Sequence, residues 1–335
     1  MAEINHERND AEPSLVTGAR AGTASNAYQW LSIIGFIAGL AIAAGVFFWL
    51  GKSVLNSWDQ VEVQLLQLSP ELLMTAAALI ACFFLCFGLS YHQSLLMAGA
   101  NIRAGVSVCI YLASLLGKYV PGRVLLVAGQ VALTQRHHVS IERSLVGFTV
   151  HHLVQVSVGI LMASPLLISA LTPGLSIGAM GVCLISFALL ASGLWTKPLN
   201  LLQRRRNRPE FNRVAPRATA RAALWVLGGW MSYSGSAVVL TMALRPELDS
   251  SALWHVGTAA IAAWLIGFLS LITPSGLGIR EGSFVLLATE VIPEPTGIVI
   301  ALMLRFLWTC LEGLAGTTAL VSSLRSKASP AGGRA

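Results

Sequence analysis

Apolar residues along this chain form long continuous runs, unlike the alternation of a strand or the narrow stripe of a surface helix. Each long run has the length of about 20 residues that a helix needs to cross a bilayer. A polar loop with Asp59 and Glu62 separates the first two runs. The runs cover residues 30–50, 72–97, 144–171, 175–195, 222–244, 252–273 and 296–324. The pattern predicts an all-α, polytopic integral membrane protein with about six to eight membrane segments.

Two apolar stretches are interrupted by proline and glycine. The first, 102–135, breaks at Pro121-Gly122, and the second, 252–292, breaks after Pro274. Proline removes a backbone donor and glycine permits a turn. Because the freed backbone groups cannot face lipid, we expect each stretch to fold back as a broken or re-entrant helical hairpin buried in protein.

The two broken stretches also belong to an internal repeat. Aligning Pro121 with Pro274 lays the helical runs on either side of the first break onto those on either side of the second. Helix, hairpin and helix therefore occur twice, in repeat one (72–171) and repeat two (222–324). The crossings between them give the copies opposite orientations. Inverted repeats with broken helices are a plan of membrane transporters, whose site lies near the midplane at the repeat interface.

Composition narrows the class of protein. Of the 335 residues 55% are hydrophobic and only 11% are charged, against about 25% in soluble domains. A soluble enzyme, a disordered chain and a disulfide scaffold are therefore excluded. The five cysteines lie in apolar runs without a CxxC pair, so we expect no metal site and no cofactor. The formal charge of +7 indicates contact with anionic lipid headgroups and not with nucleic acid.

Charge placement predicts the topology. The loop 197–221 carries a dense group of arginines against one glutamate, so the positive-inside rule makes it cytoplasmic. If both hairpins are re-entrant, the domain 30–325 crosses the membrane about six times, with about eight full crossings as the alternative. The N-terminal 1–29 is then a disordered cytoplasmic tail, and 326–335 is a short cytoplasmic tail.

Basic residues stand beside both breaks and suggest an anion site. They are Lys118 and Arg123 at the first break and Arg280 at the second. A helix that begins after a break also offers backbone donors and a positive dipole end. Arg280 would hold a phosphate with Glu281 orienting it or receiving an amine; the alternative is a local ion pair between these two residues.

The last run and its repeat partner add further candidates. Arg305 and Glu312 lie about two helical turns apart on nearly one face, and each is expected to reach a partner on another helix. His152 occupies the repeat position of Arg305, either as a satisfied buried histidine or as a proton or headgroup contact. The complete candidate substrate site is Lys118, Pro121, Gly122, Arg123, His152, Pro274, Gly276, Gly278, Arg280, Glu281, Arg305 and Glu312.

Two segments resemble a known family. GKYVPGRV at 117–124 and TPSGLGIREG at 273–282 are similar to the signature segments of the lysylphosphatidylglycerol synthase transmembrane-region family, and the resemblance covers about 30–325. It implies an inner-membrane protein whose bifunctional relatives use the homologous domain to move an aminoacylated anionic lipid between leaflets. Because no soluble synthase domain follows residue 325, we expect no aminoacyl-transfer enzyme.

Together these features favour a lipid flippase of the bacterial inner membrane. Its cargo would be an anionic or modified phospholipid or a polyprenyl-linked lipid, and its partners would be membrane lipids with anionic headgroups. The alternative is a non-transporting scaffold or regulator that binds a lipid- or glycan-synthesis enzyme. Ser275 follows Pro274 and does not stand in a Gly-x-Ser-x-Gly pentapeptide, and no HExxH motif is present, which argues against a protease built on this serine and against a membrane metalloenzyme.

Overall fold

The computed structural model of the chain describes residues 58–119, 124–170, 196–205, 216–270 and 273–325, with scattered residues between 44 and 56 and between 177 and 192. The described residues are helical apart from short turns and contain no strand. The predicted all-α fold is therefore confirmed. The predicted runs 30–50 and 175–195 lie largely outside the described residues, and the tails 1–29 and 326–335 lie entirely outside them.

Among the described residues, five helices are long and apolar enough to cross a membrane. They are α3 (Pro70–Met97), α6 (Ile141–Ala170), α9 (Pro216–Leu244), α10 (Ser250–Leu269) and α12 (Glu294–Arg325). Local signals fix where they begin. The Ser69 side chain accepts the Leu72 amide at the start of α3, and the Asp249 carboxylate accepts the Ala252 amide at the start of α10. Each cap satisfies a donor that the first turn leaves free.

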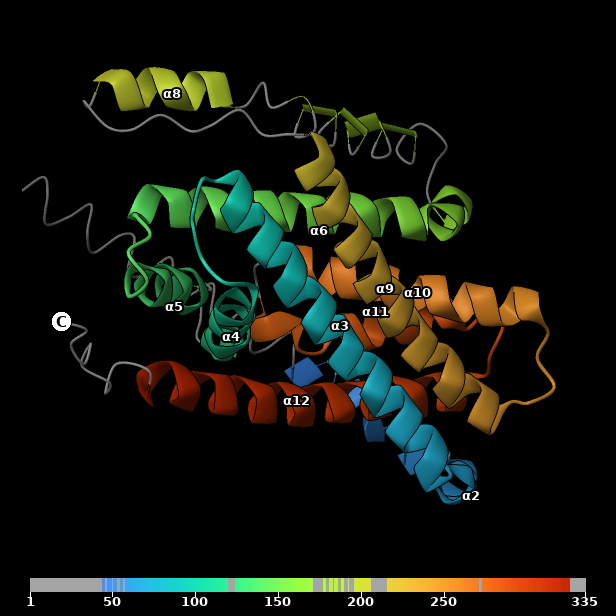
Figure 1. Ribbon diagram of the computed structural model, residues 1–335. Coiled ribbons are helices and arrows are strands. Elements are labelled where there is room, and N and C mark those ends of the chain that lie inside the picture. Colours follow the sequence, from blue (N-terminus) through green and yellow to red (C-terminus); the bar gives the residue numbers. More distant parts are fainter. Residues whose placement is uncertain are drawn as a thin grey trace, which may run out of the picture.

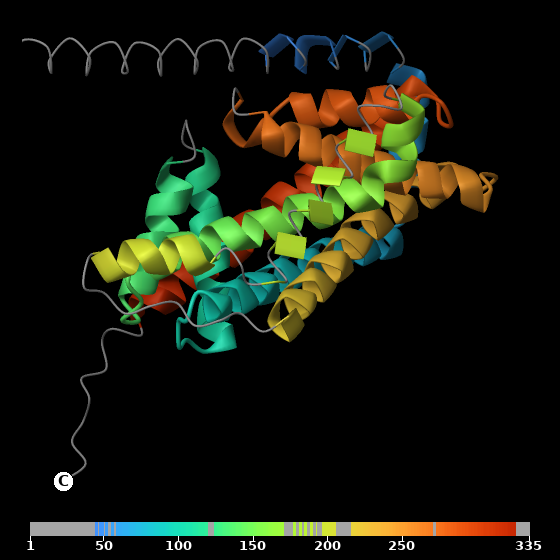
Figure 2. The ribbon, with the colours of Figure 1, turned by 90° about the horizontal axis from the view of Figure 1, so that it is seen from above.

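The first broken stretch folds back on itself. It consists of α4 (Ala104–Leu115), the 3-10 turn η1 (Leu116–Tyr119) and α5 (Val124–Gln135). The two short arms pack against each other and stand side by side in Figure 2. A Cβ atom on Gly117 would lie 2.6 Å from the backbone carbonyl carbon of Leu125. Glycine at this position therefore lets the arms touch close to the break.

The second broken stretch is less symmetric than predicted. Helix α10 is long enough to be a span in its own right, whereas α11 (Ile279–Ala288) is short. Between them lies the 3-10 turn η3 (Pro274–Gly276). Gly276 and Gly278 have φ of +69° and +80°, in the left-handed region that glycine enters without a Cβ penalty. The chain can thus reverse here, and α11 packs back along α10.

The same order of elements occurs in both halves of the molecule, and the halves run in opposite directions. Helices α3 and α9 pack along their lengths and are antiparallel, and α6 and α12 also point in opposite senses (Figure 1). Helix α4 packs against α12, and its counterpart α10 packs against α6. Each hairpin therefore packs on the last helix of the other half, so the inverted repeats interlock.

Two segments predicted as loops contain helices. Helix α2 (Trp58–Gln67) replaces the polar loop after the first run. It buries Val61 and hydrogen-bonds through Gln64 Nε2 to Thr296 Oγ1 of α12 at 2.9 Å. Helix α8 (Thr196–Arg205) begins the basic segment, and α9 starts inside it at Pro216. The charged residues of these segments led to the prediction of loops, but amphipathic segments of this kind can still form helices.

An aromatic core fills the crossing of the central helices. Phe83 of α3 lies 4.8 Å from Trp308 of α12, and Trp230 of α9 lies 5.0 Å from Trp264 of α10, measured between ring centroids. The buried indole of Trp230 donates to the Gln155 carbonyl of α6 at 3.1 Å. Rings packed at these distances supply both dispersion and specific geometry. Two of these rings, Trp264 and Trp308, line the cavity described next.

Candidate functional site

A cavity of about 580 Å³, including its open mouth, lies between the two hairpins, α6 and α12. Residues from both halves of the chain line it. They are Tyr111, Leu115, Lys118, Leu126, His152, Gln155, Trp264, Gly267, Phe268, Ser275, Arg280 and Trp308. The cavity therefore sits at the interface of the two repeats.

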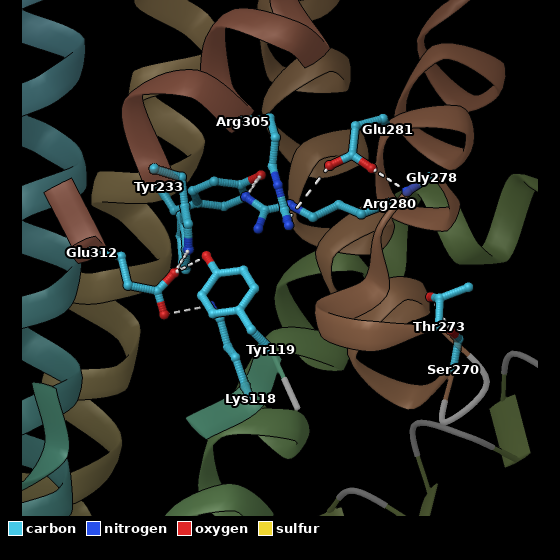
Figure 3. Close-up of polar contacts among 11 residues, drawn as sticks. Lys118, Tyr119, Tyr233, Ser270, Thr273, Gly278, Arg280, Glu281, Arg305 and Glu312 are labelled. Carbon is cyan, nitrogen blue, oxygen red and sulfur yellow. Dashed lines mark hydrogen bonds and ion pairs between the residues drawn. The ribbon is translucent and has the colours of Figure 1, made fainter. Parts of the chain in front are cut away.

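Glu312 of α12 is the centre of one buried polar cluster. Its Oε1 lies 2.7 Å from Lys118 Nζ of the first hairpin. Its Oε2 accepts the Tyr119 hydroxyl at 3.0 Å and the Trp308 indole N–H at 2.9 Å (Figure 3). The residue is only 1% exposed, and three donors compensate the carboxylate. This cluster ties the tip of the first hairpin to the last helix.

Glu281 forms a second cluster at the second break. Its Oε2 accepts the backbone N–H of Gly278 at 2.7 Å, which is how a glutamate in the first turn caps the helix that it begins. Its Oε1 lies 3.6 Å from Arg305 Nη1 of α12. The carboxylate thus fixes the start of α11 and pairs with another helix. It makes no ion pair with its neighbour Arg280 within the described residues, so the local pair that the sequence left open does not form there.

Arg280 is held in a different way from the other two cations. Its Nη2 donates to the Tyr233 hydroxyl at 2.6 Å. Its guanidinium carbon lies 4.4 Å from the ring centroid of Trp308 and 4.9 Å from that of Tyr233, within range of cation–π attraction. The residue is 8% exposed and has no ion-pair partner within the described part of the chain. A buried arginine that lines a cavity without a carboxylate is suited to bind an anion.

The charges of the site do not cancel. Lys118, Arg280 and Arg305 face the carboxylates of Glu281 and Glu312, so the described residues leave one positive charge in excess. Uncompensated charge is costly in a poorly hydrated interior. An anion that enters the cavity would offset that cost. No group of histidine, cysteine and acidic side chains that could hold a metal ion occurs in the described residues.

The remaining predicted site residues divide into two groups. His152 lines the cavity, where its Nδ1 lies 2.9 Å from the Phe148 carbonyl and its ring stacks on Phe268 at 5.6 Å. Gly276 and Gly278 shape the break that begins at Pro274, and Ser275 of that turn reaches the cavity. The second group lies in the connection between the arms of the first hairpin. These predicted residues, Pro121, Gly122 and Arg123, lie outside the described residues.

Three aromatic residues of the site were missed by the sequence prediction. Trp308 had a usable signal, because it stands between Arg305 and Glu312 at spacings that share one helix face. Tyr119 directly follows Lys118 and could have been included with it. Tyr233 had no signal, since nothing in the sequence of α9 separates it from a lipid-facing or core tyrosine.

Comparison with known proteins identifies the family. No curated protein matches the chain significantly. The family profile described as the lysylphosphatidylglycerol synthase TM region matches residues 36–316. This range contains both hairpins and every residue of the two carboxylate clusters. The chain is therefore a multi-pass membrane protein that belongs to the lysylphosphatidylglycerol synthase TM-region family.

Proposed function

We propose that the protein moves a lipid with an anionic headgroup between the leaflets of the bacterial inner membrane. The observation that carries this proposal is Arg280, a buried cation that faces a cavity and is held by Tyr233 and Trp308 instead of by a carboxylate. Family membership supports a lipid-related role. The cargo would be an anionic or modified phospholipid or a polyprenyl-linked lipid.

The mechanism rests on replacing water around the headgroup. Stripping water from a phosphate is the main barrier to moving a lipid across a bilayer. A guanidinium has five N–H donors in a planar fork, and one of those on Arg280 is used by Tyr233. The others are available for two parallel bonds to a phosphate. The acyl chains would stay in the bilayer while the headgroup occupies the cavity.

Both repeats supply the site, which suits alternating access. The clusters around Glu312 and Glu281 connect the two hairpin regions to α12. Rocking of one repeat against the other would open the cavity to one leaflet at a time. The sequence contains no P-loop motif, so we propose passive or ion-coupled transport. In this proposal both termini are cytoplasmic and the chain catalyses no reaction.

Lipid translocation in proteoliposomes tests the proposal. The purified protein is reconstituted, and the inward movement of fluorescent phosphatidylglycerol is compared with that of fluorescent phosphatidylcholine by quenching the outer leaflet. We expect faster movement of the anionic lipid than in empty vesicles. Arg280→Gln should reduce that rate at least tenfold, which corresponds to about 1.4 kcal/mol of lost stabilisation.

Arg245→Gln is the matched control, because Arg245 pairs with Glu247 in the turn after α9 and lies outside the cavity. Its rate should equal that of the wild type. Equal rates for Arg280→Gln and wild type would remove Arg280 from the site. Rates equal to empty vesicles for phosphatidylglycerol and for polyprenyl-phosphate lipids would overturn transport and leave a scaffold or regulator of a synthesis enzyme.

A further inference from the structure

We infer that His151 is a proton-binding site coupled to the headgroup cavity, so that an anionic headgroup and a proton bind together. The inference rests on the anion site proposed above and adds a second ligand to it. His151 belongs to α6, and its neighbour in sequence, His152, lines the cavity. Coupling of this kind would make the lipid movement proton-linked.

His151 is completely buried, with 0% of the residue exposed. Its Nδ1 lies 3.4 Å from the Ser90 hydroxyl oxygen of α3. Its Nε2 is buried and has no hydrogen-bond partner in the described structure. With the hydrogen on Nδ1 donated to Ser90, the lone pair of Nε2 is free to accept a proton.

Tyr111 of α4 connects this imidazole to the cavity. The Tyr111 ring lies 5.3 Å from the His151 ring, measured between centroids, and Tyr111 also lines the cavity together with Lys118 and Arg280. A charge in the cavity is therefore one side chain away from His151. At low effective dielectric, charges interact strongly over such a distance.

The groups around His151 offer no counter-charge to an imidazolium while the cavity holds no anion. Its titratable contacts are Tyr91 from α3, Tyr111 from α4 and His152 from α6 itself. Among the described residues, α5, α9 and α10 bring no titratable group into contact with it. No carboxylate of the described residues contacts the His151 ring. The site beyond Tyr111 carries an excess positive charge, from Lys118, Arg280 and Arg305 against Glu281 and Glu312.

Binding of an anionic headgroup removes the excess positive charge beside His151. Its negative charge offsets the excess positive charge, so a proton from solvent can add to Nε2 and form an imidazolium. By thermodynamic reciprocity, the proton strengthens headgroup binding by the same factor. A headgroup with a single negative charge would then move together with the proton, with no net charge.

Calorimetric titration of the purified full-length protein tests the coupling. The probe is the short-chain lipid dihexanoyl-phosphatidylglycerol, titrated in detergent micelles in two buffers with different ionisation enthalpies. We expect uptake of up to one proton per bound lipid. Where the free imidazole is neutral, affinity should fall by up to about tenfold for each unit of pH increase, because binding then consumes one proton.

Variants assign the proton to one residue. His151→Gln, or His151→Asn if the first variant does not fold, should bind the probe without proton uptake and with an affinity independent of pH. His92→Gln is the matched control, because His92 is a partly buried histidine of α3 that hydrogen-bonds Ser107 outside the cavity. It should retain the proton uptake of the wild type.

The outcomes separate this inference from the proposed function. Binding by the wild type without proton uptake overturns the coupling and leaves the anion site intact. Loss of uptake in His152→Gln but not in the His151 variants moves the proton to His152 and overturns the assignment. Absence of probe binding by the wild type overturns the anion site, and the coupling with it.

Discussion

At the residue scale, the site is defined by how each buried charge is compensated. Glu312 receives three donors, Glu281 receives a backbone amide and an arginine, and Arg280 receives a hydroxyl and two aromatic faces. Breaking a buried pair by removing one partner is far more destabilising than replacing both partners. The three arrangements should therefore respond differently to substitution.

The Lys118–Glu312 pair gives a direct test of this idea. Glu312→Met leaves Lys118, which is 15% exposed, without its counter-charge, so we expect a loss of up to about 3–5 kcal/mol. Lys118→Met should cost less, because Tyr119 and Trp308 still donate to the carboxylate. The order of the midpoints of thermal unfolding in detergent checks this expectation. The double variant should be more stable than Glu312→Met alone, and a double variant at least as unstable as the sum of both single losses would contradict it.

At the scale of elements, the break between α10 and α11 depends on backbone geometry. Gly276 has a positive φ, and a Cβ atom there would lie 2.7 Å from the carbonyl oxygen of Gly267. A left-handed conformation costs a residue with a Cβ about 1–2 kcal/mol, and the contact adds to that cost. This turn determines where α11 starts, and therefore how the side chains of Arg280 and Glu281 are directed.

Gly276→Ala should therefore lower the thermal midpoint and weaken anion binding together. Gly313→Ala is the matched control, because Gly313 lies inside α12 with no atom within 4 Å of the added Cβ. There alanine should raise helix stability by about 0.5–1 kcal/mol. Thermal unfolding of both variants in one detergent provides the comparison. Equal stability of Gly276→Ala and wild type would show that the turn tolerates a side chain.

At the scale of the whole molecule, the two halves depend on each other for burial. Each hairpin packs on the last helix of the other half, and the cavity takes its lining from both. Neither half alone would cover its broken backbone, and exposed backbone polar groups are not tolerated in lipid. We therefore expect the halves to insert and fold as one unit with a fixed topology.

Labelling in intact cells tests the topology proposed above. In a background with the native cysteines replaced by alanine, a cysteine at exposed Glu247, after α9, should react with a membrane-impermeant maleimide. A cysteine at exposed Arg136, between α5 and α6, should react only after the cells are opened. Reaction of both from the same side would contradict the topology with about six crossings and cytoplasmic termini.

The sequence by itself determined the helices and their breaks. The predicted runs 72–97 and 222–244 correspond to α3 (Pro70–Met97) and α9 (Pro216–Leu244), which end at the predicted residues and begin earlier. The reason is physical. A helix in lipid needs a continuous apolar segment, and an interrupted backbone exposes polar groups that lipid cannot hydrogen-bond. The apolar run and its interruption are both visible in the local sequence. The break at Pro274 was found in the same way, and the first break falls between η1 and α5, whose connection with Pro121 lies outside the described residues.

Only the tertiary structure decided which charges meet. Glu281 pairs with Arg305 instead of Arg280, and Tyr233 and Trp308 complete the setting of Arg280. It also decided that α10 is a long arm and that the polar segment after the first run contains α2. These features depend on how helices distant in sequence pack. A residue's type and its neighbours along the chain specify its charge and the helix that carries it, but its burial and the partner that compensates its charge come from other helices.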